Sequence, residues 1–165
     1  LTIREQKKET APHALKNILV PLDFSDHSKV SLLHAKGIAN SYNAELRLLH
    51  VIDQKTVPVF YPAGMQSILA ASKKVKERCE KTMVSYLEDT GEIKRKEIVS
   101  VVEGHAASDI VKYAKDHQVD MIVIATHGLT GLQHMLIGSV SEKVVRMAHC
   151  PVFVVKAYGK SLVGH

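Results

Sequence analysis

The sequence predicts an α/β domain with a doubly wound, mostly parallel five-stranded sheet that has helices on both faces. Five short apolar segments alternate with four segments of helical periodicity, and strands joined through helices need crossover connections, which make them parallel. The segments 17–22 and 121–125 are apolar almost throughout, as in strands that are covered on both faces. At 165 residues, the chain is long enough for one domain with one core.

The strand expected at 17–22 leads into the first helix. Ser25 or Asp26 can start this helix, because a side-chain oxygen at the N-cap accepts hydrogen bonds from free N–H groups. Helical spacing predicts an inward-facing stripe made of Val30, Leu33, Gly37 and Ile38.

The second strand is expected at 46–52. His50 alternates there with Leu46 and Leu48, which favours a hydrogen-bonded histidine of the interior or of a crevice. The loop 53–64 carries two prolines and two aromatic residues, and a loop of this length is more often functional than idle. The sequence leaves open whether it covers a ligand or docks a partner.

A long second helix is expected at about 65–88, with Gly91 just beyond its end. One face of this helix is traced by Ile68, Ser72, Val75, Cys79, Met83, Tyr86 and Leu87. Because Cys79 lies on this face, a buried structural thiol is favoured over a reactive one.

The remaining elements repeat the alternation. They are expected as strand 98–102, helix 106–117, strand 121–125, helix 139–148 and strand 152–155. Cys150 stands directly before Pro151 at the entry to the last strand, and no neighbouring cation is evident that would lower its pKa, which favours a packing role.

Composition excludes several classes of protein. Hydrophobic residues make up 45% of the chain and charged residues 24%, which is typical of a globular domain rather than a disordered one. No apolar run approaches the ~20 residues that a membrane-spanning helix needs. Two cysteines outside any C-x-x-C spacing argue against a disulfide framework or a thiolate zinc site and favour a reducing, cytoplasmic location.

The termini and the charge pattern complete the outline. Residues 1–15 are polar, without the apolar core of a signal peptide, and are interpreted as a flexible leader to a domain at 16–157 with a tail at 158–165. The net charge is +5, but the basic residues around 73–81 and 94–96 are interleaved with glutamates. Such mixed charge is typical of a solvated helix face, so specific nucleic-acid binding is not expected.

Two strand ends are candidates for a ligand site, since ligands of open parallel sheets bind beyond the carboxyl ends of the strands. The first strand ends in Pro21-Leu-Asp23, where Asp23 can accept hydrogen bonds from a ligand or cap the following helix. The residues alone leave both roles open, with capping the commoner one.

The richer candidate is the segment that follows the fourth strand. Gly128, Gly131 and Gly138 allow a close approach to an anion and positive φ angles, and the helix that begins at Gly138-Ser139 offers unpaired N–H groups to a phosphate. Additional donors are the hydroxyls of Thr126, Thr130, Ser139 and Ser141. The alternative is a capping box, Ser139-Val-Ser-Glu142, in which Glu142 competes with a phosphate for the same N–H groups.

The chain resembles the universal stress protein family over nearly all of residues 16–156. The motifs that carry the resemblance are Ile18-Leu-Val-Pro-Leu-Asp-Phe-Ser25, His50-Val-Ile52, Val102-Glu-Gly-His-Ala106, Asp120-Met-Ile-Val-Ile-Ala-Thr-His-Gly128, Gly138-Ser-Val140 and Cys150-Pro-Val-Phe-Val-Val155. Nucleotide-binding members carry the pattern G-x-x-G-x9-G-[ST], and nine residues separate Gly128 from Gly138-Ser139 here. The first glycine of the pattern is replaced by Ala125, and Leu129 stands where many relatives have a basic residue.

The resemblance implies a strand order of 3-2-1-4-5 and a bound adenine nucleotide, ATP, with Mg2+ held by its phosphates. Asp23 and Val51 would contact adenine, with Pro21 beside them. The turn that would wrap the ribose and the phosphates consists of Ala125, Thr126, His127, Gly128, Leu129, Thr130 and Gly131. Ser139, Val140 and Ser141 would hold the phosphates.

The resemblance also implies a homodimer, paired through the last strand. Its residues are Val152, Phe153, Val154 and Val155.

Three functions follow for comparison. The leading one is a stress-response module that binds a nucleotide and senses it; the others are a protein that acts by interaction without nucleotide, and a very slow ATP hydrolase. Phosphoryl transfer needs strong cationic clamps, and no lysine or arginine lies between Thr126 and Glu142. The sequence therefore favours binding over catalysis, and His127 is interpreted as structural or adjacent to the ribose.

Overall fold

The computed structural model of the chain describes residues 14–53, 65–90, 97–126 and 138–156, with the backbone alone at 65–71. The expected leader, most of the loop 53–64, the glycine-bearing turn 127–137 and the tail lie outside the described residues. No helix in the described ranges combines the length and the apolar character needed to cross a membrane.

The sheet has the predicted architecture. Its order is β3-β2-β1-β4-β5, and every neighbouring pair is parallel. The strands are β1 (Asn17–Pro21), β2 (Glu45–Asp53), β3 (Glu97–Gly104), β4 (Met121–Ala125) and β5 (Val152–Val155). Ile18 pairs with Leu46 of β2 and with Met121 of β4, so β1 is the central strand. The chain adds β2 and β3 on one side of β1 and then β4 and β5 on the other.

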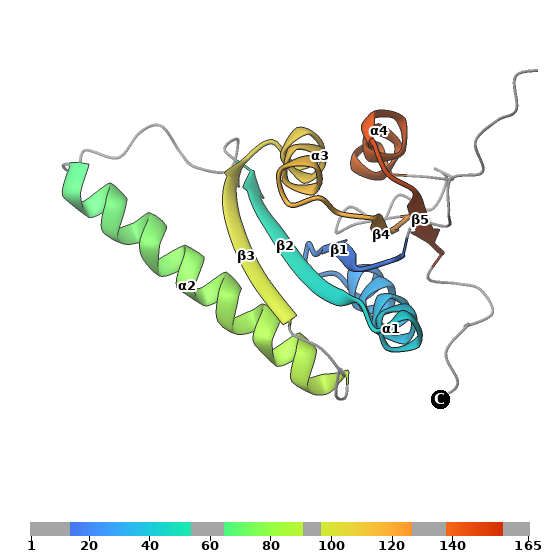
Figure 1. Cartoon of the computed structure of the whole chain (residues 1–165). Coiled ribbons are helices and arrows are strands. Elements are labelled where there is room, and N and C mark those ends of the chain that lie inside the picture. The colour runs from blue at the N-terminus through green and yellow to red at the C-terminus, as the bar shows by residue number, and fades with distance from the viewer. Residues whose placement is uncertain (1–13, 54–64, 91–96, 127–137, 157–165) are drawn as a thin grey trace, which may run out of the picture.

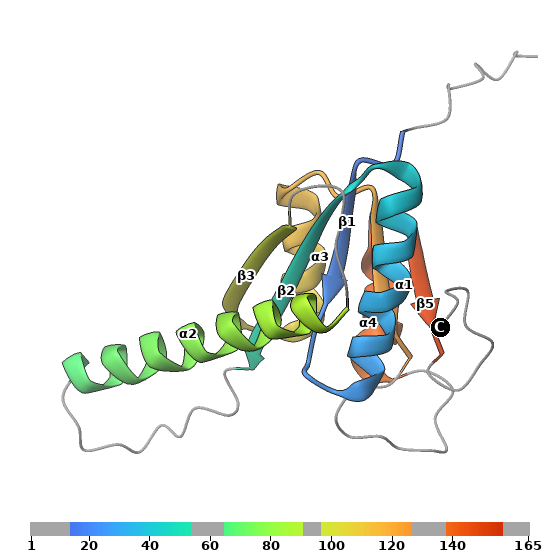
Figure 2. The ribbon, with the colours of Figure 1, turned by 90° about the horizontal axis from the view of Figure 1, so that it is seen from below.

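Four helices cover the two faces, as Figures 1 and 2 show. They are α1 (Asp26–Tyr42), α2 (Met65–Asp89), α3 (Ala106–Asp116) and α4 (Ser139–Met147). Alternate side chains of a strand point to opposite faces of the sheet. In β1, Ile18 and Val20 pack with α1 and α2, whereas Leu19 packs with α3 and α4. The two cores lie back to back across one sheet, which confirms the doubly wound prediction.

The start and the inward face of α1 have a local explanation. Ser25 is the N-cap, and its Oγ accepts the Ser28 N–H at 3.1 Å. The expected inward stripe is wrong at Leu33, which is 37% exposed, while Leu32, Ala35 and Ala39 are buried. Val30 and Ile38 do pack against this core, so the inward face of α1 combines these apolar residues and Leu32 with small side chains that let the helix approach the sheet closely.

The inward face expected for α2 is correct only toward its C-terminal end. Met83 and Leu87 are buried, and Cys79 and Tyr86 pack against the same core. Val75 is 48% exposed because the N-terminal part of α2 runs past the β3 edge of the sheet (Figures 1 and 2). The mixed-charge surface around residues 73–78 is exposed, as expected of a solvated helix face.

Candidate functional site

A pocket of about 360 Å³ opens at the carboxyl ends of β1, β2 and β4. This is the position at which the strand order reverses, and therefore the expected place for a ligand in such a sheet. Predicted site residues that line it are Pro21, Asp23, Val51, Ala125, Gly138, Ser139, Val140 and Ser141. Segments more than a hundred residues apart in the sequence thus meet at one place.

Of the other predicted site residues, Thr126 is described and the rest lie outside the described residues. Thr126 is buried; its N–H donates to Val155 O at 2.9 Å, and its carbonyl accepts the Gly138 N–H at 2.5 Å. These two bonds fix the end of β4 against β5 and bring the start of α4 back to it. His127, Gly128, Leu129, Thr130 and Gly131 lie outside the described residues.

The residues at the N-terminus of α4 line the pocket. Gly138 is the N-cap, with φ −69° and ψ 154°, so the positive φ expected at this glycine is wrong. No side-chain cap is recorded there within the described residues, and Glu142 is exposed. The capping box that competed with the phosphate interpretation is therefore not formed.

Ser141 has an internal role. Its side chain is buried, and its Oγ donates to Ala125 O at 2.6 Å. The hydroxyl hydrogen thus holds the first turn of α4 against the end of β4, whereas Ser139 and Val140 are exposed at the pocket.

The helices α1 and α3 also begin at this edge, and α1 has a side-chain cap, whereas α3 has a side-chain partner only for the N–H of its N-cap residue. Ser25 caps α1, and the Asp109 carboxylate accepts the His105 N–H at the start of α3 at 2.6 Å. A Cβ at Gly104 would collide with that carboxylate, so glycine at the end of β3 makes room for it. The N-cap residue of α3, like that of α4, makes no side-chain capping hydrogen bond. What sets α4 apart is that Gly138, Ser139, Val140 and Ser141 all line the pocket, whereas α3 contributes Ala106 and Ile110.

The opposite side of the pocket combines an apolar wall with carboxylates. Asp23 lies on this side, and its Oδ1 accepts the N–H and the hydroxyl of Ser25 at 3.1 and 2.6 Å. Asp23 therefore supports the helix cap instead of being the cap, and it lines the pocket as well. Sequence reasoning missed these lining residues: Leu22, Ser28, Leu49, Asp53, Ala106, Ile110 and Ile124.

Some of the missed residues carried a usable signal. Asp53 ends β2, next to β1, and the rule that ligands bind at strand carboxyl ends could have identified it. Ile110 carried no such signal, because an apolar residue inside a helix is expected to face the core. Within the described ranges, no three His, Cys, Asp or Glu side chains gather in an arrangement that could hold a metal ion.

The structure confirms that His50 is a hydrogen-bonded histidine, as predicted. Its Nδ1 lies 2.7 Å from Leu22 O, and since a carbonyl only accepts, Nδ1 carries the hydrogen. The ring also packs on Phe24, with 4.3 Å between the ring centroids. His50 thus connects β2 to the turn that carries Asp23.

Comparison with known proteins agrees with this architecture. The model of the universal stress protein family matches residues 14–156. The chain belongs to the universal stress protein family. Universal stress protein MJ0531 of Methanocaldococcus jannaschii is 35% identical over 141 residues, which cover 86% of this chain and 82% of that relative.

Several solved structures have the same fold as this universal stress protein. The structure of the hypothetical protein MJ0577 has a TM-score of 0.75 at 31% identity, covering 89% of this chain and 99% of the other. A universal stress protein in complex with cAMP shares the fold at a TM-score of 0.64 and 21% identity, covering 86% of this chain and 97% of the other. An Archaeoglobus fulgidus universal stress protein in complex with dAMP does so at 0.56 and 20%, covering 87% and 99%.

Proposed function

We propose that this universal stress protein binds an adenine nucleotide, with ATP as the leading candidate, and works as a sensor of that nucleotide. The observation that carries the proposal is the N-terminus of α4, which enters the pocket with no recorded side-chain cap. A helix N-terminus in this state presents donors and a partial positive charge. Both suit a phosphate group.

The phosphates would lie against the first turn of α4, near Gly138, Ser139 and Val140. Backbone N–H groups make these contacts, so the replacement of a family glycine by Ala125 and of a basic residue by Leu129 leaves the principal donors in place. Mg2+ would be held by the phosphates of the nucleotide. This arrangement is supported by the donors at the start of α4, which are backbone amides and hydroxyls. Such groups bind the phosphate anion, and the phosphates in turn would bind Mg2+.

The base would occupy the opposite side of the pocket, against Val51 and Leu49. Apolar walls with a few oriented polar groups are typical of small-molecule sites. Asp23 supplies the orienting group, because its carboxylate can accept a hydrogen bond from the exocyclic amine of adenine. Guanine has an acceptor at the equivalent position, so the same carboxylate would disfavour it.

The ligands of two family structures support this class of ligand. The universal stress proteins in complex with cAMP and dAMP hold adenine nucleotides on the same fold. The choice of ATP over these monophosphates is supported by the glycine spacing between Gly128 and Gly138.

Binding without efficient catalysis is part of the proposal. No lysine or arginine occurs from 127 to 141, so this segment offers no cationic clamp for a transferred phosphoryl group. The output would be a change in the homodimer or in partner choice. Occupancy can shift such an equilibrium only as far as the nucleotide binds one state more tightly than the other.

The first experiment looks for the nucleotide itself. The chain is purified without added nucleotide and denatured, and the supernatant is separated by anion exchange with detection at 260 nm. In parallel, the melting temperature is measured with ATP, ADP, AMP and GTP in the presence of Mg2+. We expect a co-purifying adenylate or a clear upward shift with ATP; the absence of both would refute nucleotide binding.

A matched pair of variants at Ser139 tests where the phosphates lie. Ser139→Pro removes one N–H from the first position of α4, where proline is well tolerated, and the extended Gly138 backbone suits a residue that precedes proline. Ser139→Ala removes the hydroxyl and keeps the N–H. We expect ATP affinity to fall about tenfold or more in Ser139→Pro relative to Ser139→Ala, since a charge-assisted hydrogen bond is lost. Equal affinities would place the phosphates elsewhere.

A further inference from the structure

The turn that carries Asp23 has an unusual backbone. Phe24, the next residue, has φ 65°, in the left-handed region that a bulky residue seldom occupies. A conformation of this kind persists only where surrounding contacts hold it. The residues that hold Phe24 therefore also hold Asp23 at the edge of the pocket.

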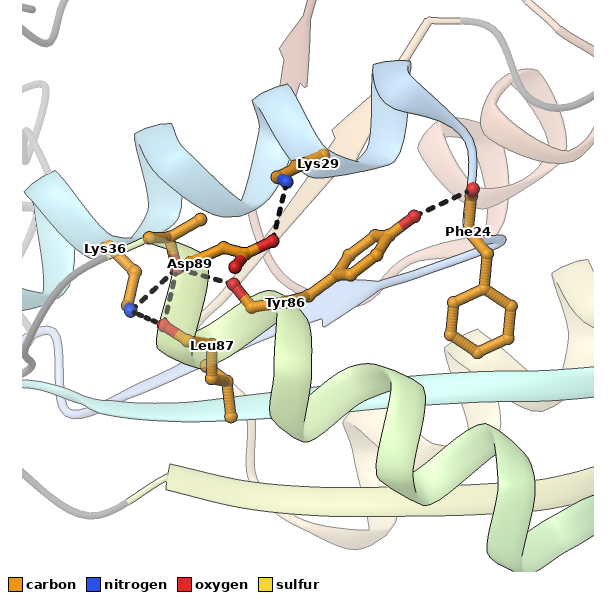
Figure 3. A network of polar contacts seen from close by, with 7 residues as sticks. Phe24, Lys29, Lys36, Tyr86, Leu87 and Asp89 are labelled. Atoms are coloured by element: carbon orange, nitrogen blue, oxygen red, sulfur yellow. Dashed lines mark hydrogen bonds and ion pairs between the residues drawn. The ribbon is translucent and has the colours of Figure 1, made fainter.

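Three groups from outside the turn make these contacts. Tyr86 of α2 donates its hydroxyl hydrogen to Phe24 O at 3.0 Å (Figure 3). Its ring meets the Phe24 ring edge-on, with 6.1 Å between centroids. His50 of β2 holds Leu22 O on the other side of Asp23, and the Leu22 N–H donates to Leu49 O at 2.9 Å.

Tyr86 is itself fixed by the contacts between α1 and α2, as Figure 3 shows. Lys29 of α1 forms an ion pair with Asp89 at 3.0 Å, and its Nζ lies 5.3 Å from the centroid of the Tyr86 ring. Lys36 donates to Leu87 O at 2.9 Å. The last turns of α2 are thus tied to α1, and the Tyr86 hydroxyl reaches the Asp23 turn from a constrained position.

We infer that Tyr86 is a positioning residue for the base end of the nucleotide site. It acts through Phe24: by holding that carbonyl it keeps the turn in the conformation that directs Asp23 to the pocket, while Tyr86 itself is not among the described residues that line the pocket. The inference rests on the proposed function and deepens it. It assigns the preference for adenine to the contact between α2 and the β1–α1 turn as well as to Asp23.

The test is a double-mutant cycle on the full chain, with affinities for ATP and GTP measured by calorimetry in the presence of Mg2+. The variants are Tyr86→Phe, Asp23→Ala and the two combined. Tyr86→Phe removes one oxygen and keeps the ring, so we expect ATP affinity to fall about threefold to tenfold, as for the loss of one hydrogen bond. GTP affinity should stay unchanged, so the ratio of the two falls. In the Asp23→Ala background, Tyr86→Phe should have no further effect on ATP affinity.

The control is Tyr42→Phe on α1, where the side chain is 65% exposed; it should alter neither affinity. A lower melting temperature of Tyr86→Phe with an unchanged ratio of ATP to GTP affinity would show a structural role alone and overturn the inference. The same loss of ATP affinity with and without Asp23 would also overturn it. If the unaltered chain binds no adenine nucleotide, the proposed function fails first, and its titration shows this separately.

Discussion

At the scale of single residues, the two cysteines show how the surroundings set reactivity. Cys79 and Cys150 are free thiols of intermediate exposure. Burial raises the pKa of the Cys79 thiol, and it does the same to the pKa of Cys150, with the nearby Asp120 charge acting in the same direction. Both side chains pack against the core, which confirms the packing role predicted for them.

Slow alkylation follows from these pKa shifts. The thiolate is the reactive form, and a raised pKa lowers its fraction at a given pH. We expect both thiols of the native chain to react with iodoacetamide at pH 8 at least several-fold more slowly than the same thiols in urea. Mass spectrometry of the labelled peptides measures each site, and native rates equal to those in urea would contradict the prediction.

Residue chemistry was predictable where it depended on local position. Ser25 as a cap and His50 as a hydrogen-bonded histidine follow from their neighbours in the sequence. The roles of Thr126 and Ser141 do not, because their partners are Val155, Gly138 and Ala125. These contacts exist only once the strands are paired. In the sequence, the Ser141 hydroxyl therefore looked available for a ligand, although it bonds to Ala125 O.

At the scale of elements, Lys36 joins three of them. It extends from α1, is buried, and donates to Leu87 O and to Thr90 Oγ1 at the end of α2, at 2.9 and 2.7 Å. Its Nζ also lies 4.0 Å from a Glu97 carboxylate oxygen at the start of β3. Burial lowers the pKa of Lys36, and the Glu97 charge opposes this only in part.

The first consequence is for stability. Lys36→Met keeps the volume and removes both hydrogen bonds, so we expect the free energy of unfolding at pH 7 to fall by about 1–3 kcal/mol, as for a buried acceptor that is left unpaired. Urea unfolding measures it. A variant at least as stable as the parent would show that the polar contacts are dispensable.

The second consequence is for pH dependence. The folded state binds the Lys36 proton less tightly than the unfolded state, so this residue adds stability as pH rises toward its ordinary pKa of 10.5. The difference between the parent and Lys36→Met should therefore grow from pH 8 to pH 10. Lys29 is the control of opposite sign: its pKa is raised, by Asp89 first of all, so the advantage of the parent over Lys29→Met is present below 10.5 and lost as pH rises through the raised pKa. From pH 8 to pH 10 the difference for Lys29→Met should therefore not grow. A difference for Lys36→Met that stays level or shrinks over this range would contradict the lowered pKa of Lys36.

Element bounds were predictable because apolar runs and caps are local signals. The strand β4 begins and ends where expected, and β2 is only one residue longer at each end, at Glu45 and Asp53. The inward faces of helices were less predictable. Which side of α1 or α2 is covered depends on where the helix crosses the sheet, and Leu33 and Val75 show that apolar spacing alone does not determine it.

At the scale of the whole molecule, the alternation of strands and helices predicts a parallel sheet but not the order of its strands. Many orders satisfy the same alternation, and 3-2-1-4-5 came from the family resemblance. The order has two effects here: it puts β1 beside β2 and β4, which creates the pocket, and it leaves β5 at an edge.

Edge strand β5 is the expected dimer contact. Pro151 O and Val155 O bond to the β4 side, so the alternation of a strand directs the backbone N–H of Val154 away from β4. Val154→Pro should therefore block pairing with a second copy while keeping the bonds to β4. We expect sedimentation velocity to show a dimer for the parent and for Val154→Ala, and a monomer for Val154→Pro. A dimeric Val154→Pro would mean that the contact lies elsewhere.

The distance in sequence between Asp23 and Ser139, both at the pocket, also bears on how the chain is made. Domains form as the chain leaves the ribosome, N-terminal part first. A nascent chain that has emerged only as far as β4 holds the carboxylate side of the pocket but not the amides of α4. It would gain the complete proposed site only when α4 emerges, so a nucleotide bound there would stabilise this domain only after α4 has joined the sheet.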